Sequence, residues 1–160
     1  MAPARIVPDW TMPSAFVFGG MWFADKLAHS EEARREHLAM RRAIVLETLS
    51  SEVLKVAFRR ERPGPGVSRN GWGDGGLSFP SGHTTAAFAF ASAVDAEWGR
   101  LSPGRPRWVA SALYGIAALT GISRVFHDRH WTSDVVMGGA IGYLTGRAIA
   151  RWHADARQAP

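Results

Sequence analysis

Three short polar motifs, far apart along the chain, restrict the folds that this sequence can adopt. They read Lys55-x6-Arg62-Pro63, Pro80-Ser81-Gly82-His83 and Ser123-Arg124-x5-His130-x3-Asp134. Together they contribute three cations, a hydroxyl beside a glycine amide, two imidazoles and one carboxylate. Phosphoryl transfer without a metal requires such a set of groups. Each motif alone is common by chance, but the three together predict a fold that brings them to one place.

The chain has the size of one domain. Its 160 residues suffice for a single core, and we expect one domain over residues 1–160. The absence of cysteine excludes disulfides, zinc–thiolate sites and thiol catalysis. A net charge of +5 at pH 7 favours anionic partners, but it does not choose between nucleic acid, anionic lipid and phosphorylated metabolites.

Hydrophobic periodicity and helix breakers predict an all-α fold of about five helices. The expected helices span residues 10–27, 43–58, 81–98, 108–123 and 132–152. Prolines and glycines from Pro63 onward end the second helix, and the glycine-rich loop at residues 64–79 is typical of a cover over a site. No window of 18 uncharged apolar residues announces a membrane-spanning helix.

Short connections predict that consecutive helices run antiparallel. The second helix then ends at residues 55–62, where the third begins at Ser81. The fourth ends near Arg124, where the fifth begins at residues 130–134. All three motifs therefore fall at one end of an antiparallel helical bundle of about five core helices, with the active site at that end. Helix starts at this end also favour a bound anion.

Three glycines on the last helix indicate close helix packing. Gly138, Gly142 and Gly146 lie four residues apart on one face. Glycine inside a helix costs about 1 kcal/mol, and close approach of a neighbouring helix is the compensation that we expect.

The two imidazoles and the carboxylate suit covalent catalysis. His130 and Asp134 share a helix face, so the carboxylate can accept a hydrogen bond from one ring nitrogen and leave the other oriented as a nucleophile. His83 can protonate the leaving alkoxide and then deprotonate the water that cleaves the phosphohistidine. We expect these three residues to be catalytic.

The other motif residues form a predicted binding site for the substrate phosphate. They are Lys55, Arg62, Ser81, Gly82 and Arg124. The alternative interpretation of the cluster Arg59, Arg60 and Arg62 is a solvated basic end. His127 and Asp128 could join Asp134 as metal ligands, but the nearby arginines raise the cost of holding a divalent cation. We therefore expect no metal and no cofactor.

The motifs resemble the signature of the phosphatidic acid phosphatase type 2 superfamily, which includes membrane lipid phosphatases, bacterial nonspecific acid phosphatases and vanadium haloperoxidases. The resemblance covers every motif position and extends over about residues 10–152. It implies His130 as nucleophile, Asp134 as its orienting group and His83 as acid, with the five residues named above binding phosphate. It also implies phosphatase activity without a metal.

Two features of the sequence depart from the family pattern. Membrane members usually have six spanning helices, whereas five with short apolar runs are expected here, and soluble members carry a signal peptide that is not evident. Haloperoxidases are much larger, so a vanadate cofactor is not expected. Basic residues are more numerous at the end away from the motifs, which predicts a membrane protein with its active site on the non-cytoplasmic face. A soluble periplasmic or secreted protein is the alternative.

The predicted function is a metal-independent phosphatase. It would hydrolyse a lipid-linked phosphomonoester or diphosphate through a phosphohistidine intermediate. The alternatives are a soluble nonspecific acid phosphatase, a vanadium-dependent haloperoxidase, and a non-catalytic module that binds anionic lipid or nucleic acid. Nucleic acid is not an expected partner of the phosphatase. Substrate identity and oligomeric state stay open.

Overall fold

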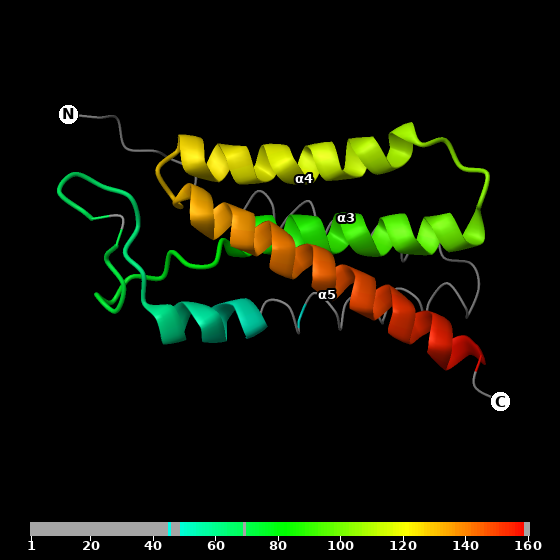
Figure 1. The fold of residues 1–160 in the computed structure, drawn as a ribbon, viewed down its shortest axis with the longest axis horizontal. Helices are drawn as coiled ribbons and strands as arrows, with labels where there is room; N and C mark the ends of the chain where they lie inside the picture. The colour runs from blue at the N-terminus through cyan, green and yellow to red at the C-terminus, as the bar shows by residue number, and fades with distance from the viewer. Residues whose placement is uncertain (1–44, 46–48, 69, 159–160) are drawn as a thin grey trace. The chain divides into compact units, whose positions relative to one another are not determined.

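The computed structural model describes residues 45, 49–68 and 70–158, which belong to one compact unit, Arg42–Pro160. These residues form helices and, within those ranges, no strand (Figure 1). The helices are residues 49–58, α3 (Gly82–Leu101), α4 (Trp108–Phe126) and α5 (Thr132–Gln158). The all-α prediction is confirmed. The predicted first helix, residues 10–27, lies outside the described residues.

The three long helices pack as an antiparallel bundle. α3 contacts both α4 and α5, and its contact with α5 is the more extensive. The chain runs along α3, returns along α4 and reverses again into α5 (Figure 1). Each helix extends beyond its predicted end, by three residues in α3 and α4 and by six in α5. Residues 123–124 of the third motif therefore form part of the last turn of α4.

The glycine stripe lets α5 pack directly on the backbone of α3. A methyl group built on the α-carbon of Gly142 would lie 2.1 Å from the carbonyl oxygen of Thr85, and one on Gly146 would lie 2.3 Å from that of Ala89. At Gly138 it would lie 2.8 Å from the Ser81 carbonyl oxygen. No side chain fits at these distances, so the prediction of tight packing is confirmed.

Small polar side chains fill the rest of this contact. The side chains of Thr84, Thr85 and Ser92 are fully buried. The Ser92 hydroxyl donates to the carbonyl oxygen of Tyr143 on α5 at 3.1 Å, and the Thr85 hydroxyl donates to the Ser81 carbonyl at 2.9 Å. Each buried hydroxyl is therefore satisfied, as a dry interface between helices requires.

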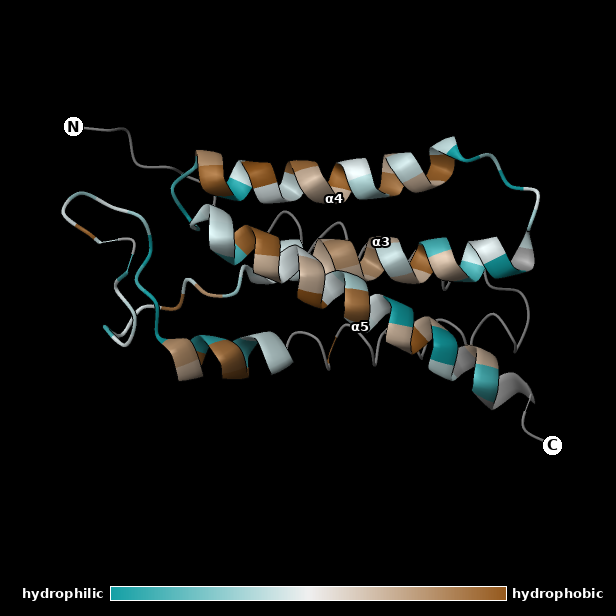
Figure 2. Cartoon of the chain, viewed as in Figure 1, coloured by the Kyte–Doolittle hydropathy of each residue, from teal (hydrophilic) through white to brown (hydrophobic). Residues whose placement is uncertain are grey.

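The outer faces of the bundle are apolar. α4 is the one helix among the described residues that is long and apolar enough to cross a membrane, and only 17% of its apolar stretch is buried. Its large exposed side chains are Trp108, Ile116, Leu119, Ile122 and Phe126, and Figure 2 shows the apolar residues along it. This helix contains no uncharged apolar run of 18 residues, because Arg124 lies in its last turn. So large an exposed apolar surface marks contact with lipid or protein.

The packing of α3 on α5 gives a first prediction. Replacing Gly142 with alanine should lower the free energy of unfolding by about 3 kcal/mol, because the added methyl overlaps the α3 backbone and the helices must separate. Gly115 is the matched control, since a methyl there meets nothing within 4 Å. Gly115→Ala should be neutral or stabilise by up to about 1 kcal/mol. Thermal unfolding in detergent measures both, and equal midpoints for the two variants would contradict the prediction.

Candidate active site

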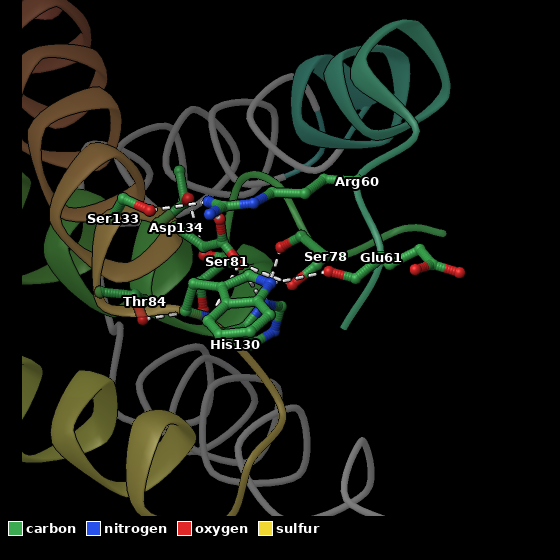
Figure 3. Close-up of polar contacts among 10 residues, drawn as sticks. Arg60, Glu61, Ser78, Ser81, Thr84, His130, Ser133 and Asp134 are labelled. Atoms are coloured by element: carbon green, nitrogen blue, oxygen red, sulfur yellow. Dashed lines mark hydrogen bonds and ion pairs between the residues drawn. The ribbon is translucent and has the colours of Figure 1, made fainter. Parts of the chain in front are cut away.

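A fully buried carboxylate, Asp134, lies in the first turn of α5 and connects the three motif regions (Figure 3). One of its oxygens, Oδ2, accepts hydrogen bonds from the Ser78 hydroxyl at 2.5 Å and from the Trp131 amide at 2.9 Å. The other, Oδ1, forms a short ion pair with Nη1 of Arg60. A carboxylate withdrawn from water is stable in its charged form only with such donors.

These contacts keep Asp134 ionised. Burial alone would raise the pKa of its carboxyl, but the His130 imidazole, the Ser78 hydroxyl, the Trp131 amide and the Arg60 guanidinium outweigh burial and lower the pKa below its ordinary value. The site therefore contains a fixed negative charge at neutral pH.

The His130 ring is held by a backbone carbonyl. The residue is 4% exposed, and its Nδ1 donates to the carbonyl oxygen of Ser78 at 2.7 Å. A carbonyl can only accept, so Nδ1 carries a proton, and in the neutral ring the lone pair is on Nε2. Asp134 Oδ2 lies 3.8 Å from Nδ1, too far for a hydrogen bond. The sequence led us to expect a direct bond from the ring to the carboxylate, whereas Ser78 supplies the nearer acceptor.

Ser78 is the common partner of the buried groups, and it is not among the residues predicted from the sequence. Its amide donates to the Arg60 carbonyl at 2.9 Å, its hydroxyl donates to Asp134, and its carbonyl accepts from His130. It is completely buried. Its position just before the second motif, at the end of a glycine-rich loop, was the available signal.

The interpretation of Arg60 as part of a solvated basic end is wrong. Arg60 is 5% exposed and pairs with Asp134, and Nη1 also donates to the Ser133 hydroxyl at 2.7 Å. Its guanidinium carbon lies 4.4 Å from the ring centre of Trp72 and 5.5 Å from that of Trp131. The buried carboxylate and the two indole rings account for the burial of this cation.

The glycine-rich loop is folded back against the end of the helix at residues 49–58. The Glu61 amide donates to the Gly71 carbonyl at 3.0 Å, and the Gly73 amide donates to the Phe58 carbonyl at 3.2 Å. A methyl at Gly76 would lie 2.4 Å from the Arg60 carbonyl oxygen, so only glycine fits there. The loop that the sequence predicts as a cover over the site forms backbone hydrogen bonds that fix the positions of Arg60 and Ser78.

Five of the eight predicted site residues are joined by close contacts. The Ser81 amide donates to the Asp134 carbonyl at 3.1 Å, and its buried hydroxyl lies 2.9 Å from that of Thr84. A methyl on Gly82 would lie 3.2 Å from Nζ of Lys55, which also pairs with Glu52. His130 and Asp134 complete the group.

The other three predicted site residues are located by the elements that carry them. His83 is half-buried in the first turn of α3, and Arg124 is half-buried in the last turn of α4. Arg62 is exposed just beyond the buried Arg60. His127 directly follows α4, where its Nδ1 contacts the Ser123 carbonyl at 2.8 Å and its ring is exposed. No three potential metal ligands are grouped together within the described part of the chain.

Known proteins resemble this chain in both sequence and fold. A family model described as the PAP2 superfamily matches residues 37–158. Lipid A 1-phosphatase of Porphyromonas gingivalis is 43% identical over 101 residues, 63% of this chain and 20% of that protein. The chain thus spans about a fifth of that relative's length.

Two solved structures share the fold. LpxE of Aquifex aeolicus is 26% identical with a TM-score of 0.63, covering 85% of this chain and 76% of that one. The first transmembrane PAP2 type phosphatidylglycerolphosphate phosphatase from Bacillus subtilis has a TM-score of 0.66 at 24% identity, covering 96% of this chain and 74% of that one. The second likeness is one of fold alone.

The contact between Arg60 and Asp134 gives a second prediction. Arg60→Ala should lower the free energy of unfolding by about 3–5 kcal/mol, because it leaves an ionised carboxylate buried without its cation. The exposed neighbour Arg59 is the matched control, and Arg59→Ala should change stability by less than about 0.5 kcal/mol. Denaturant unfolding in detergent would measure both, and equal losses would show that Arg60 contributes no more than a surface arginine.

The lowered pKa of Asp134 leads to a third prediction, on how stability depends on pH. A carboxyl whose pKa is lower in the folded state stabilises the fold above its ordinary pKa, which is 3.8 here, and loses this contribution as the pH falls through the folded value. Asp134→Asn cannot titrate. The difference in melting temperature between wild type and variant should therefore be full at pH 7 and shrink below about pH 4. A difference that stays constant from pH 7 to pH 3 would refute the lowered pKa.

Proposed function

The chain belongs to the PAP2 superfamily, and from this premise we propose that it is a phosphatase acting on a lipid-linked phosphomonoester or diphosphate without a metal. The observation that carries the proposal is the buried His130 ring, whose Nδ1 is bonded to the Ser78 carbonyl. This bond leaves the Nε2 lone pair as the nucleophile. No other imidazole among the described residues is both buried and held in this way.

In the proposed reaction, Nε2 of His130 attacks phosphorus and the bond from phosphorus to the ester oxygen breaks. His83 gives its proton to the leaving alkoxide. His83 then takes a proton from water, whose oxygen displaces the imidazole and releases phosphate. The ring is an imidazolium while it bears the phosphoryl group, and the fixed charge of Asp134, 3.8 Å from Nδ1, stabilises that state.

Cations and amides at the start of α3 would hold the transferred group. Lys55 lies beside Gly82, whose amide is in the first turn of α3, where helix amides have no intrahelical acceptor. Arg62 and Arg124 would neutralise the remaining phosphate charge, and Ser81 would contribute its hydroxyl. These assignments rest on the match to the motifs and on the contacts among the five joined residues.

Two observations support a lipid substrate and a membrane location. The exposed apolar face of α4 suits the hydrocarbon of a bilayer. An open apolar groove of about 910 Å³ is formed by α3, α4 and α5 and lined by Phe88, Tyr114, Phe126, Thr132 and Val135 among others. Its lining includes both ends of the turn from α4 to α5 that contains His130, so an acyl chain there would adjoin the site. The relative named lipid A 1-phosphatase supports the same substrate class.

The active site is proposed to face the non-cytoplasmic side, because the basic residues gather at the opposite end. A soluble acid phosphatase is the rival. Partition of the expressed chain into the aqueous rather than the detergent phase would favour that rival.

The fourth prediction tests the nucleophile. His130→Ala should lower kcat by at least about a thousandfold, because it removes the group that attacks phosphorus. His127→Ala, at an exposed histidine three residues away, should keep activity within about twofold of wild type. Phosphate release would be measured with phosphatidate, a prenyl diphosphate, lipid A and a chromogenic monoester, each with and without excess EDTA.

The same assay separates the alternatives. Wild-type activity should survive EDTA, and a labelled phosphoryl group should be trapped on wild type but not on His130→Ala. Full activity in His130→Ala would end the proposed mechanism. Loss of wild-type activity in EDTA that is restored by a divalent cation would end its metal-free character.

A further inference from the structure

A buried serine one turn before Lys55 has no assigned role. Ser51 is 2% exposed, and its hydroxyl forms no hydrogen bond with any described residue. Buried hydroxyls are almost always paired, and an unpaired one destabilises the free protein. Such a group is retained where a ligand supplies its partner.

The Ser51 hydroxyl faces the predicted phosphate site. Ser51 and Lys55 are four residues apart on one helix, so both side chains lie on one face. A methyl group on the α-carbon of Gly82 would lie 3.2 Å from Nζ of Lys55 and 3.5 Å from Oγ of Ser51. Both groups therefore border the same small space against the first turn of α3, which only a glycine leaves open.

From this geometry we infer that Ser51 binds the substrate phosphate by donating a hydrogen bond from its hydroxyl to a non-bridging oxygen, beside the ammonium group of Lys55. The inference rests on the proposed function and adds a phosphate ligand that lies outside the three motifs. A neutral donor suits this position, because Lys55 already supplies charge and a longer side chain would occupy the space of the anion.

The ion pair of Lys55 with Glu52 is compatible with this role. Glu52 has a side chain that is 53% exposed, whereas that of Lys55 is 14% exposed. A bound phosphate can therefore replace a carboxylate that returns to water at little cost. Ser51 has no such partner to give up, so its hydroxyl is ready to donate when the anion arrives.

The test compares adjacent serines in the full chain. Ser51→Ala removes the proposed donor, and Ser50→Ala, at the exposed neighbour, is the matched control. Inhibition by vanadate and binding of inorganic phosphate, followed by phosphorus NMR, should weaken about tenfold in Ser51→Ala, the usual effect of one hydrogen bond to a charged group. kcat/KM should fall by a similar factor. Ser50→Ala should match wild type in each measurement.

A second variant separates hydrogen bonding from packing. Ser51→Cys keeps the size of the side chain but offers a weak donor, so it should resemble Ser51→Ala in phosphate affinity. Both variants should melt at or above the wild-type temperature, because they remove an unpaired buried hydroxyl. Wild-type affinity for phosphate in Ser51→Ala, or a loss of affinity in Ser51→Ala that Ser51→Cys restores in full, would overturn the inference.

Binding measurements also keep this inference distinct from the proposed function. Phosphate affinity with and without the Ser51→Ala change can be measured again in the His130→Ala background, where no turnover is expected. If the wild-type chain shows no phosphatase activity on any substrate but its phosphate affinity depends on Ser51, the proposed function is refuted and the phosphate ligand is supported. If the chain is an active phosphatase but its affinities for phosphate and vanadate do not change in Ser51→Ala, the proposed function is supported and the role of Ser51 is refuted.

Discussion

The charge of Asp134 organises the whole site. A carboxylate that is fully withdrawn from water requires donors on every side, and these come from three separate segments. Arg60 follows the helix at residues 49–58, Ser78 precedes α3, and Trp131 precedes α5. None of these segments can move away without leaving a buried charge unpaired. The Asp134 carboxylate thus holds together the loop and the starts of α3 and α5.

The glycine stripe on α5 and the contacts of Asp134 depend on each other. Because Gly138 has no side chain, α5 approaches α3 closely enough for the Asp134 carbonyl to accept the Ser81 amide. Helix packing therefore sets the distance between the second and third motifs. Further along the contact, Gly142 and Gly146 keep α5 close to the α3 backbone, so the stability of the bundle and the geometry of the site share one cause.

The apolar exterior and the polar site complement each other in the proposed function. A lipid phosphatase must take a charged group from a molecule whose remainder stays in hydrocarbon. Here the exposed face of α4 and the groove beside Phe126 are apolar, while the buried polar groups around Asp134 and His130 lie at the adjoining end of the bundle. In the proposed function, this arrangement would place the phosphate of a lipid substrate and its acyl chains in different surroundings that adjoin each other.

The sequence itself determined three features, because periodicity, helix breakers and spacing are local properties. These features are the helical fold, the close packing at the glycines, and the convergence of motif residues such as Lys55, Gly82 and Asp134. Only the tertiary structure decided that Arg60 holds the buried carboxylate and that the Ser78 carbonyl fixes the His130 proton. These partners come from a loop whose path depends on many backbone hydrogen bonds at once. A backbone carbonyl, moreover, has no residue type by which a sequence can identify it.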